Sequence, residues 1–284
     1  MRSRSKILGS SGIERRAVGW QDGVMETGAS LVKNRDFGAP LRWLGGAILD
    51  LIYPPVCLAC DAPVASADAL CTACFRELRP ITAPLCPVLG LPFEVSLGPG
   101  ARSAEAIADP PPFDRARAAV IYNDVARRIV SRLKYSDRPE LARLCASLMA
   151  QAGHELWGGG AVLLPVPLHP LRQLSRRYNQ STELARALSR LTGIPVDPVL
   201  ALRRKRTRQQ VGLSADGRQR NVAGAFAPHP DLLQRLRGRR VIIVDDVVTT
   251  GATVKSVTRA LKAGGGERVD VISFARVVPG RSDG

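Results

Sequence analysis

The chain of 284 residues is long enough for one sizeable α/β domain and a small additional module. Its apolar fraction of 45% is ordinary for a globular protein. The most apolar N-terminal run, Leu44–Ile52, is far shorter than the roughly 20 residues of a membrane-spanning helix. Arg15, Arg16 and Asp22 interrupt any apolar core that a secretory signal would need. We therefore expect no membrane insertion and a cytoplasmic location.

Positive charge is the most unusual property of the composition. The chain has 41 Lys and Arg against 25 Asp and Glu, which gives a net charge of +16 and a pI near 10.6. The excess is concentrated between Arg172 and Arg220, where twelve basic residues accompany only three acidic ones. Such a cluster favours an anionic partner, either a phosphorylated ligand or nucleic acid. Solvated arginine-rich faces would produce the same totals.

The N-terminal part of the chain has two sections. Residues 1–40 mix glycine, serine and charged residues with no sustained period, so we expect a disordered extension. Met25 is an alternative to Met1 as the true start. Leu41–Tyr53 has an apolar, helix-like pattern that ends at Pro54 and Pro55.

A cysteine module completes the section that we assign to residues 41–90, a helix followed by a zinc-ribbon-like unit. Cys57 and Cys60 form one C-x2-C pair, and Cys71 and Cys74 form another after a gap of ten residues. Two such turns can present four thiolates to a tetrahedral zinc ion at about 2.3 Å. In a reducing compartment a metal is favoured over disulfides. Cys86 is a possible substitute ligand, so which four sulfurs bind zinc stays open at this point.

Residues 91–112 are rich in proline, glycine and alanine and are predicted to be a linker, and residues 113–279 are predicted to form an α/β domain. Short apolar, β-branched runs alternate there with helix-like stretches, which is typical of a parallel sheet flanked by helices. The expected strands are Ala118–Tyr122, Ala161–Val166, Arg240–Val244 and Val269–Phe274. The expected helices are Asp124–Lys134, Glu140–Ala152, Gln180–Leu191 and Ala252–Ala263.

The segment after the third expected strand is suited to bind a sugar phosphate. Asp245 and Asp246 follow the strand, and Thr249–Thr253 precedes a helix. In α/β folds the loop at the carboxyl end of a parallel strand is where ligands bind. Gly251 lets the backbone approach an anion closely, and free N–H groups at a helix start can hold a phosphate. Adjacent carboxylates can accept hydrogen bonds from vicinal sugar hydroxyls and can reach Mg²⁺ through water.

Val241–Thr253 resembles, over all thirteen residues, the phosphoribosyl pyrophosphate (PRPP) signature of type I phosphoribosyltransferases. The resemblance implies that fold, with Asp245 and Asp246 holding the ribose 2′ and 3′ hydroxyls. It also implies that the 5′-phosphate is bound by Thr249, Thr250, Gly251, Ala252 and Thr253. Mg²⁺ would accompany PRPP.

The chain as a whole resembles the ComF family, from about Leu41 to Val278. The features that carry this resemblance are the double C-x2-C segment, Lys134-Tyr135, the Leu164–His169 run that leads into Arg172–Gln180, and the basic stretch around Arg203–Asn221. Members join a zinc ribbon to a phosphoribosyltransferase domain and are associated with natural competence and DNA uptake. This chain departs from the family pattern twice: Arg177 stands where a glycine is usual, and Cys86 is followed by Pro-Val-Leu89 where a further C-x2-C is common.

The resemblance also implies a pyrophosphate loop and a lid. Arg176 or Arg177 would be the cationic contact of the leaving pyrophosphate, because arginine fits phosphate in a bidentate manner. The other implied residues of the loop and lid are Pro167, His169, Asn179, Gln180, Arg208 and Arg218. The catalytic hypothesis is displacement of pyrophosphate from C1 of PRPP, with Asp245, Asp246, Arg176 and Arg177 as the catalytic set. No segment identifies the acceptor or the oligomeric state.

A second hypothesis is a non-catalytic single-stranded-DNA-binding protein of the transformation machinery. The basic loops and the zinc ribbon would contact DNA, with competence and DNA-processing proteins as further partners. The aromatic content of 5% speaks against it, because single-strand binding uses aromatic stacking.

Overall fold

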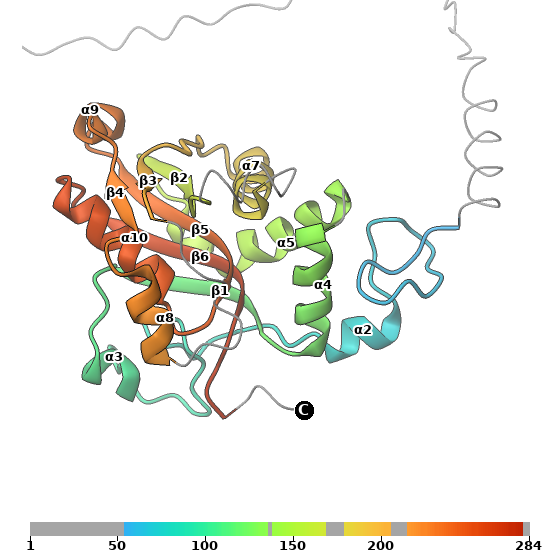
Figure 1. Ribbon diagram of the computed structural model, residues 1–284. Coiled ribbons are helices and arrows are strands. Elements are labelled where there is room, and N and C mark those ends of the chain that lie inside the picture. The colour runs from blue at the N-terminus through green and yellow to red at the C-terminus, as the bar shows by residue number, and fades with distance from the viewer. Residues whose placement is uncertain (1–53, 136–137, 169–178, 206–214, 281–284) are drawn as a thin grey trace, which may run out of the picture. The chain divides into compact units, whose positions relative to one another are not determined.

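The computed structural model describes residues 54–135, 138–168, 179–205 and 215–280 (Figure 1). The expected extension 1–40 and the helix expected at Leu41–Tyr53 lie outside these residues. Within the described ranges, no helix combines the length and the apolar character needed to cross a membrane.

A parallel sheet of four strands forms the centre of the described chain, in the order β1-β6-β5-β2. The strands are β1 (Arg115–Ile121), β2 (Ala161–Pro165), β5 (Arg240–Val248) and β6 (Val269–Arg276). Nearly every residue of these strands is buried, as expected for strands covered on both faces. Beyond β2, Val196 forms an isolated parallel bridge with Leu163.

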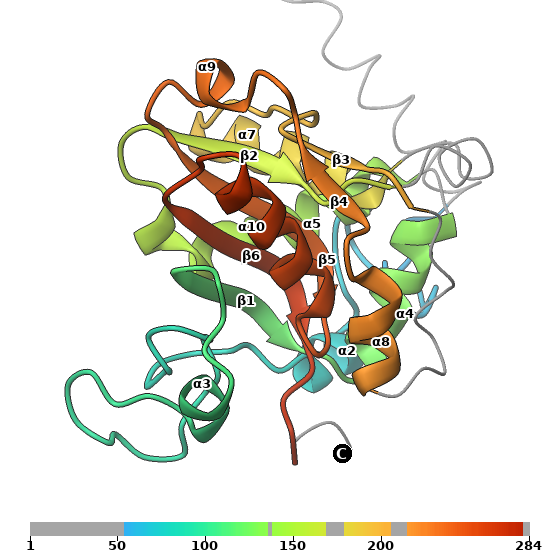
Figure 2. The ribbon, with the colours of Figure 1, turned by 60° about the vertical axis from the view of Figure 1, so that its left-hand side comes forward.

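Helices cover both faces of the sheet (Figure 2). Residues Ile242 and Val244 of β5 pack on the side of α4 (Asp124–Tyr135), α5 (Pro139–Ala152) and α7 (Gln180–Thr192). Val241 and Ile243 face α10 (Ala252–Ala263) instead, since side chains alternate along a strand. The smaller elements are η1 (His154–Leu156), β3 (Ala201–Arg203), α8 (Ala215–Val222), β4 (Phe226–Pro228) and α9 (Leu232–Leu236), with β3 and β4 antiparallel.

The architecture confirms the predicted fold class, a parallel sheet flanked by helices, and the expected strands and helices occur close to their predicted bounds. The main difference concerns β5. The strand was expected to end at Val244, but it continues to Val248 because Val247 and Val248 still pair with Ala275 and Arg276 of β6. The two aspartates therefore lie within the strand rather than after it.

The cysteine-containing segment contacts the outer edge of the sheet. It contains α2 (Thr72–Glu77) and α3 (Ala104–Ala108). Between these helices Pro80 bridges Val120 in antiparallel fashion, and Ile81 N donates to Ala119 O at 3.0 Å. The segment 91–112, expected to be a linker, differs from that expectation: Leu91 and Ala106 are buried in the same hydrophobic cluster as β1, because they pack directly against the sheet.

Candidate functional site

Two aspartates at the carboxyl end of β5 form the centre of the candidate site. Asp245 is only 9% exposed, and its Oδ1 accepts a hydrogen bond from Ser181 Oγ at 3.3 Å. Asp246 forms an ion pair with Lys134, whose Nζ lies 2.9 Å from Oδ2. The end of α4, the start of α7 and β5 therefore converge on one pair of carboxylates.

The environment of the two carboxylates changes their proton affinity. Burial, together with the neighbouring charge of Asp246, raises the pKa of Asp245 from 3.8 to about 8. Burial alone would lower the pKa of Lys134, but the carboxylates of Asp246 and Asp245 raise it above its ordinary value. Two acids thus share one cation, and the site has spare capacity for hydroxyl donors or for a further positive charge.

The turn between β5 and α10 has the geometry of an anion site. Gly251 adopts a left-handed conformation, φ 75°, and has no side chain that could cap the first N–H groups of α10. Thr250 Oγ1 accepts a hydrogen bond from Ala252 N at 3.4 Å, so the turn supplies both hydroxyl and amide groups. The turn borders a small hollow that is partly open to solvent, lined by Asp245, Val247, Val248, Thr249, Gly251, Ala252, Thr253 and Val254. The positive dipole end of a helix that starts at a glycine favours a phosphate there.

The chain that follows β2 lies next to this site. Val166 N donates to Val244 O at 2.9 Å, and Asn179 Nδ2 donates to Val166 O at 3.1 Å. Asn179 also begins α7, because its Oδ1 accepts from Ser181 N at 3.1 Å. Gln180 is 3% exposed, and its Nε2 has no hydrogen-bond partner among the described residues. A buried amide of this kind is costly unless something satisfies it.

The structure brings together only part of the predicted pyrophosphate loop and lid. Pro167 lies at the end of β2, where its carbonyl accepts from Arg203 Nη1 at 3.5 Å. His169, Arg176, Arg177 and Arg208 lie outside the described residues, as does the side chain of Arg218. The sequence also missed two contacts. Lys134 was noted without a role, and nothing in the pattern marked Ser181.

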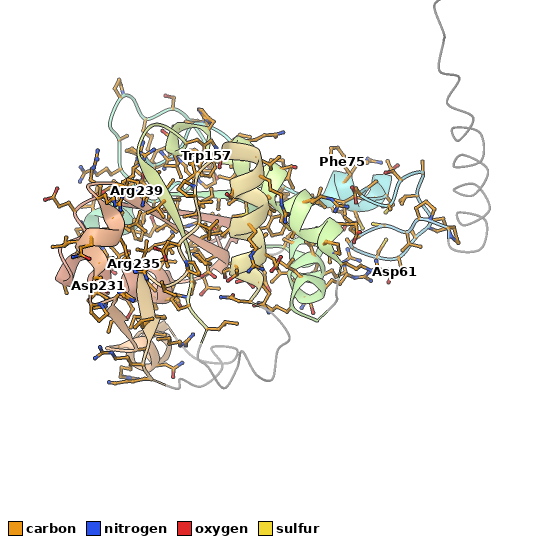
Figure 3. All side chains as sticks on the ribbon, turned by 90° about the horizontal axis from the view of Figure 1, so that it is seen from above. Asp61, Phe75, Trp157, Asp231, Arg235 and Arg239 are labelled. Atoms are coloured by element: carbon orange, nitrogen blue, oxygen red, sulfur yellow. The ribbon has the colours of Figure 1, made fainter. Side chains whose placement is uncertain are left out.

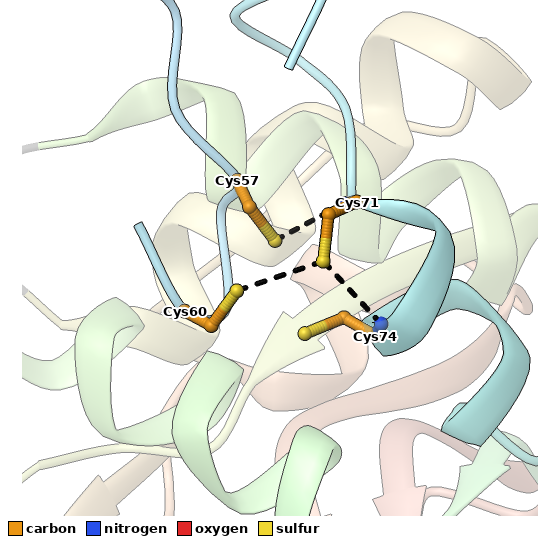
Figure 4. Close-up of side chains that lie close together, drawn as sticks. All are labelled: Cys57, Cys60, Cys71 and Cys74. Atoms are coloured by element: carbon orange, nitrogen blue, oxygen red, sulfur yellow. Dashed lines mark hydrogen bonds between the residues drawn. The ribbon is translucent and has the colours of Figure 1, made fainter. Parts of the chain in front are cut away.

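Four cysteine thiols form a second site (Figure 4). The sulfurs of Cys57, Cys60, Cys71 and Cys74 all lie within 4.8 Å of one another, with Cys60 and Cys71 3.6 Å apart. A tetrahedral zinc with bonds of about 2.3 Å separates its sulfurs by roughly 3.8 Å, so the group fits that ion. Burial alone would raise the pKa of Cys57, but hydrogen bonds from the backbone N–H groups of Cys71 and Ala59 lower it to about 6. A stabilised thiolate is the form that binds metal.

The fold brings four of the six cysteines together. Cys86 lies outside the cluster that the described residues form, so the spacing-based set of four cysteines is the one that the fold assembles. On α2, just after this cluster, Phe75 is 69% exposed (Figure 3).

Comparison with known proteins finds relatives for both the cysteine-containing segment and the α/β domain. A double zinc ribbon domain model matches residues 48–107, and a phosphoribosyl transferase domain model matches residues 132–282. The DNA utilization protein YhgH of Salmonella typhimurium is 32% identical over 234 residues, which cover 80% of this chain and all of that protein. Competence protein F of Haemophilus influenzae is 29% identical over 215 residues, 74% of this chain and 91% of the relative. The chain therefore belongs to the ComF family, in which a double zinc ribbon precedes a phosphoribosyltransferase domain.

Proposed function

We propose that the site at the end of β5 binds PRPP together with Mg²⁺. The observation that carries the proposal is a hollow lined both by the buried Asp245 and by the start of α10, with Asp246 next to Asp245 on β5 and paired with Lys134. A ribose 5-phosphate needs both groups, since its hydroxyls donate to carboxylates and its phosphate accepts from N–H groups. The 5′-phosphate would occupy the Thr249–Thr253 turn, and the ribose would lie over Asp245 and Asp246.

Transfer of the phosphoribosyl group is the chemistry that we propose for this site. The bond between C1 of the ribose and the pyrophosphate oxygen breaks, pyrophosphate leaves with the electron pair, and a lone pair of the acceptor forms the new bond to C1. Asp245 and Asp246 would anchor the ribose during this step, and Arg176 or Arg177 would contact the leaving group. Mg²⁺ supplies neutralising charge on the pyrophosphate. Release of pyrophosphate in the presence of candidate bases is the assay for turnover.

Calorimetric titration of PRPP and Mg²⁺ tests the binding proposal. We expect saturable binding by the wild-type protein and a loss of at least about 30-fold in affinity for Asp245→Asn/Asp246→Asn. A hydrogen bond to the charged Asp246 contributes about 1.5–3 kcal/mol, and one to the protonated Asp245 contributes about 0.5–1.5 kcal/mol. A charge-matched control, Asp61→Asn/Asp68→Asn, removes two carboxylates of the cysteine module and should bind normally. Absence of binding by wild type, or equal affinity of both double variants, would reject the proposal.

A link to DNA is the second part of the proposal. It rests on the names of two relatives, DNA utilization protein and competence protein, and on the basic stretch Arg172–Arg220. If the protein contacts four phosphates of a single strand, its affinity for that strand should fall about 50-fold when the salt concentration rises fourfold. Fluorescence anisotropy of a labelled oligothymidine at 50 and 200 mM salt measures this change. Affinity that is independent of salt would reject electrostatic DNA binding and would leave the PRPP proposal intact.

A further inference from the structure

The chain contains a second copy of the backbone that surrounds the first C-x2-C turn. In the first copy, Cys57 N donates to Ala62 O at 2.7 Å, and Val56 bridges Pro63. In the second copy, Cys86 N donates to Leu91 O at 2.8 Å, and Leu85 bridges Pro92. The turns also place a left-handed residue at the same point, Asp61 with φ 63° and Gly90 with φ 64°. The two turns therefore have the same hydrogen-bonding pattern and the same reversal.

The second half of the ribbon is copied as well. Cys71 N donates to Cys57 Sγ at 3.2 Å, and Ser103 N donates to Cys86 Sγ at 3.4 Å. Cys71 is the N-cap of α2, accepting from Cys74 N at 3.5 Å. Ser103 is in the same way the N-cap of α3, accepting from Ala106 N at 3.4 Å. These contacts match each residue of the first thiol cluster with one residue of the second copy.

The matched positions do not carry a second set of metal ligands. Cys57 corresponds to Cys86, Cys60 to Leu89, Cys71 to Ser103 and Cys74 to Ala106. Leu89 and Ala106 have no donor atom, and the hydroxyl of Ser103 caps α3. Structural zinc requires four protein ligands, which are nearly always cysteine or histidine. Across the described residues, only the first cluster groups three or more potential ligands closely enough to share an ion.

We propose that the second ribbon is a metal-free copy of the first, so that this protein holds one zinc ion although its family description is a double zinc ribbon. Leu89 and Ala106 replace the metal with apolar burial, packed in the cluster that contains Phe113 and Ala116. Strand β1 supplies the remaining contacts, one from its main chain and one from a side chain. Ala116 N donates to Val88 O at 2.7 Å, and Arg117 Nη1 donates to Pro87 O at 3.1 Å.

Tertiary contacts explain why this copy folds without an ion. A small ribbon has too little apolar surface to stabilise itself, and a metal usually makes up the difference. The second ribbon is instead fastened to a strand of the central sheet through its backbone and through the guanidinium of Arg117. The fold of the second ribbon is therefore coupled to the sheet and does not require an ion.

Metal analysis of the purified full chain tests the proposal. We expect native mass spectrometry and elemental analysis to give one zinc per wild-type chain. Cys74→Ser should lower this value, and Cys86→Ala, the matched change in the second ribbon, should leave it at one. Two zinc ions per wild-type chain, or loss of zinc in a folded Cys86→Ala variant, would overturn the proposal. The wild-type count decides the question by itself if Cys86→Ala does not fold.

Restoring the missing ligands provides a positive test of the residue correspondence. The variant Leu89→Cys/Ser103→Cys/Ala106→Cys combines three new thiols with Cys86 and should raise the count from one zinc to two. A folded triple variant that still binds one zinc would contradict the correspondence. Chelation of the wild type, followed by alkylation and peptide mapping, should label Cys57 and Cys74 and spare Cys86. Labelling of all three at the same rate would contradict a metal-independent second ribbon.

Discussion

The ion pair between Lys134 and Asp246 offers a quantitative test of how the carboxylate pair is held. Their side chains are 30% and 14% exposed, and the atoms lie 2.9 Å apart. Exposed pairs contribute up to about 1 kcal/mol, and breaking a buried pair costs about 3–5 kcal/mol. This pair lies between these limits, so we expect a coupling energy of about 1–3 kcal/mol.

Urea denaturation of Lys134→Met, Asp246→Asn and the double variant measures this coupling in a double-mutant cycle. A second cycle on the same helix is the control: Arg128 and Glu77 are 3.5 Å apart, and their side chains are 43% and 61% exposed. Arg128→Met with Glu77→Gln should give less than about 0.5 kcal/mol. If the Lys134 cycle is additive within about 0.3 kcal/mol, or no larger than the control, the ion pair does not hold the carboxylates.

Two further predictions concern pH and close packing. Because the folded-state pKa of Asp245 is raised to about 8, its contribution to stability is complete below about pH 4 and is lost as pH rises towards 8. The free energy of unfolding of Asp245→Asn, measured by chemical denaturation, should therefore rise by roughly 2–4 kcal/mol relative to wild type between pH 5 and 8, at about 1.4 kcal/mol per pH unit. A difference between the two proteins that does not change with pH would contradict the buried, protonated carboxyl. Gly90→Ala should lower the free energy of unfolding by more than about 2 kcal/mol. The new Cβ would lie 2.3 Å from Ala116 O, and position 90 has a φ of +64°. Asp61→Ala, at the matched turn, should lose less, and equal losses would contradict the close approach to β1.

The position of Asp245 and Asp246 at the carboxyl edge of the sheet could be predicted from the sequence, because it depends only on local sequence patterns. A buried apolar run, two acids and a Thr-Gly turn before a helix can be placed at the carboxyl edge of a parallel sheet without knowing the remaining packing. The prediction ended β5 too early, at Val244. Its continuation to Val248 depends on pairing with Arg276, which is distant in sequence. The role of Lys134 was missed for the same reason, since the end of α4 must be placed before its charge partner is known.

The second ribbon shows a different limit of the sequence. The resemblance of residues 84–107 to the first ribbon lies in backbone hydrogen bonds, while three of the four ligand types have changed. The spacing changes too: ten residues separate Cys60 and Cys71, and thirteen separate Leu89 and Ser103. A search for cysteine pairs therefore finds the first copy and interprets the second as a linker. Burial of Leu91 and Ala106 against the sheet corrects that interpretation.

A crystal structure of the protein with PRPP and Mg²⁺ tests the central proposal most directly. We predict that the 5′-phosphate lies within hydrogen-bond distance of the backbone N–H groups in Thr249–Thr253, at the start of α10. The ribose 2′ and 3′ hydroxyls should contact Asp245 and Asp246, with Lys134 still beside Asp246. PRPP bound elsewhere, or in this hollow with its ribose turned away from both carboxylates, would contradict the account.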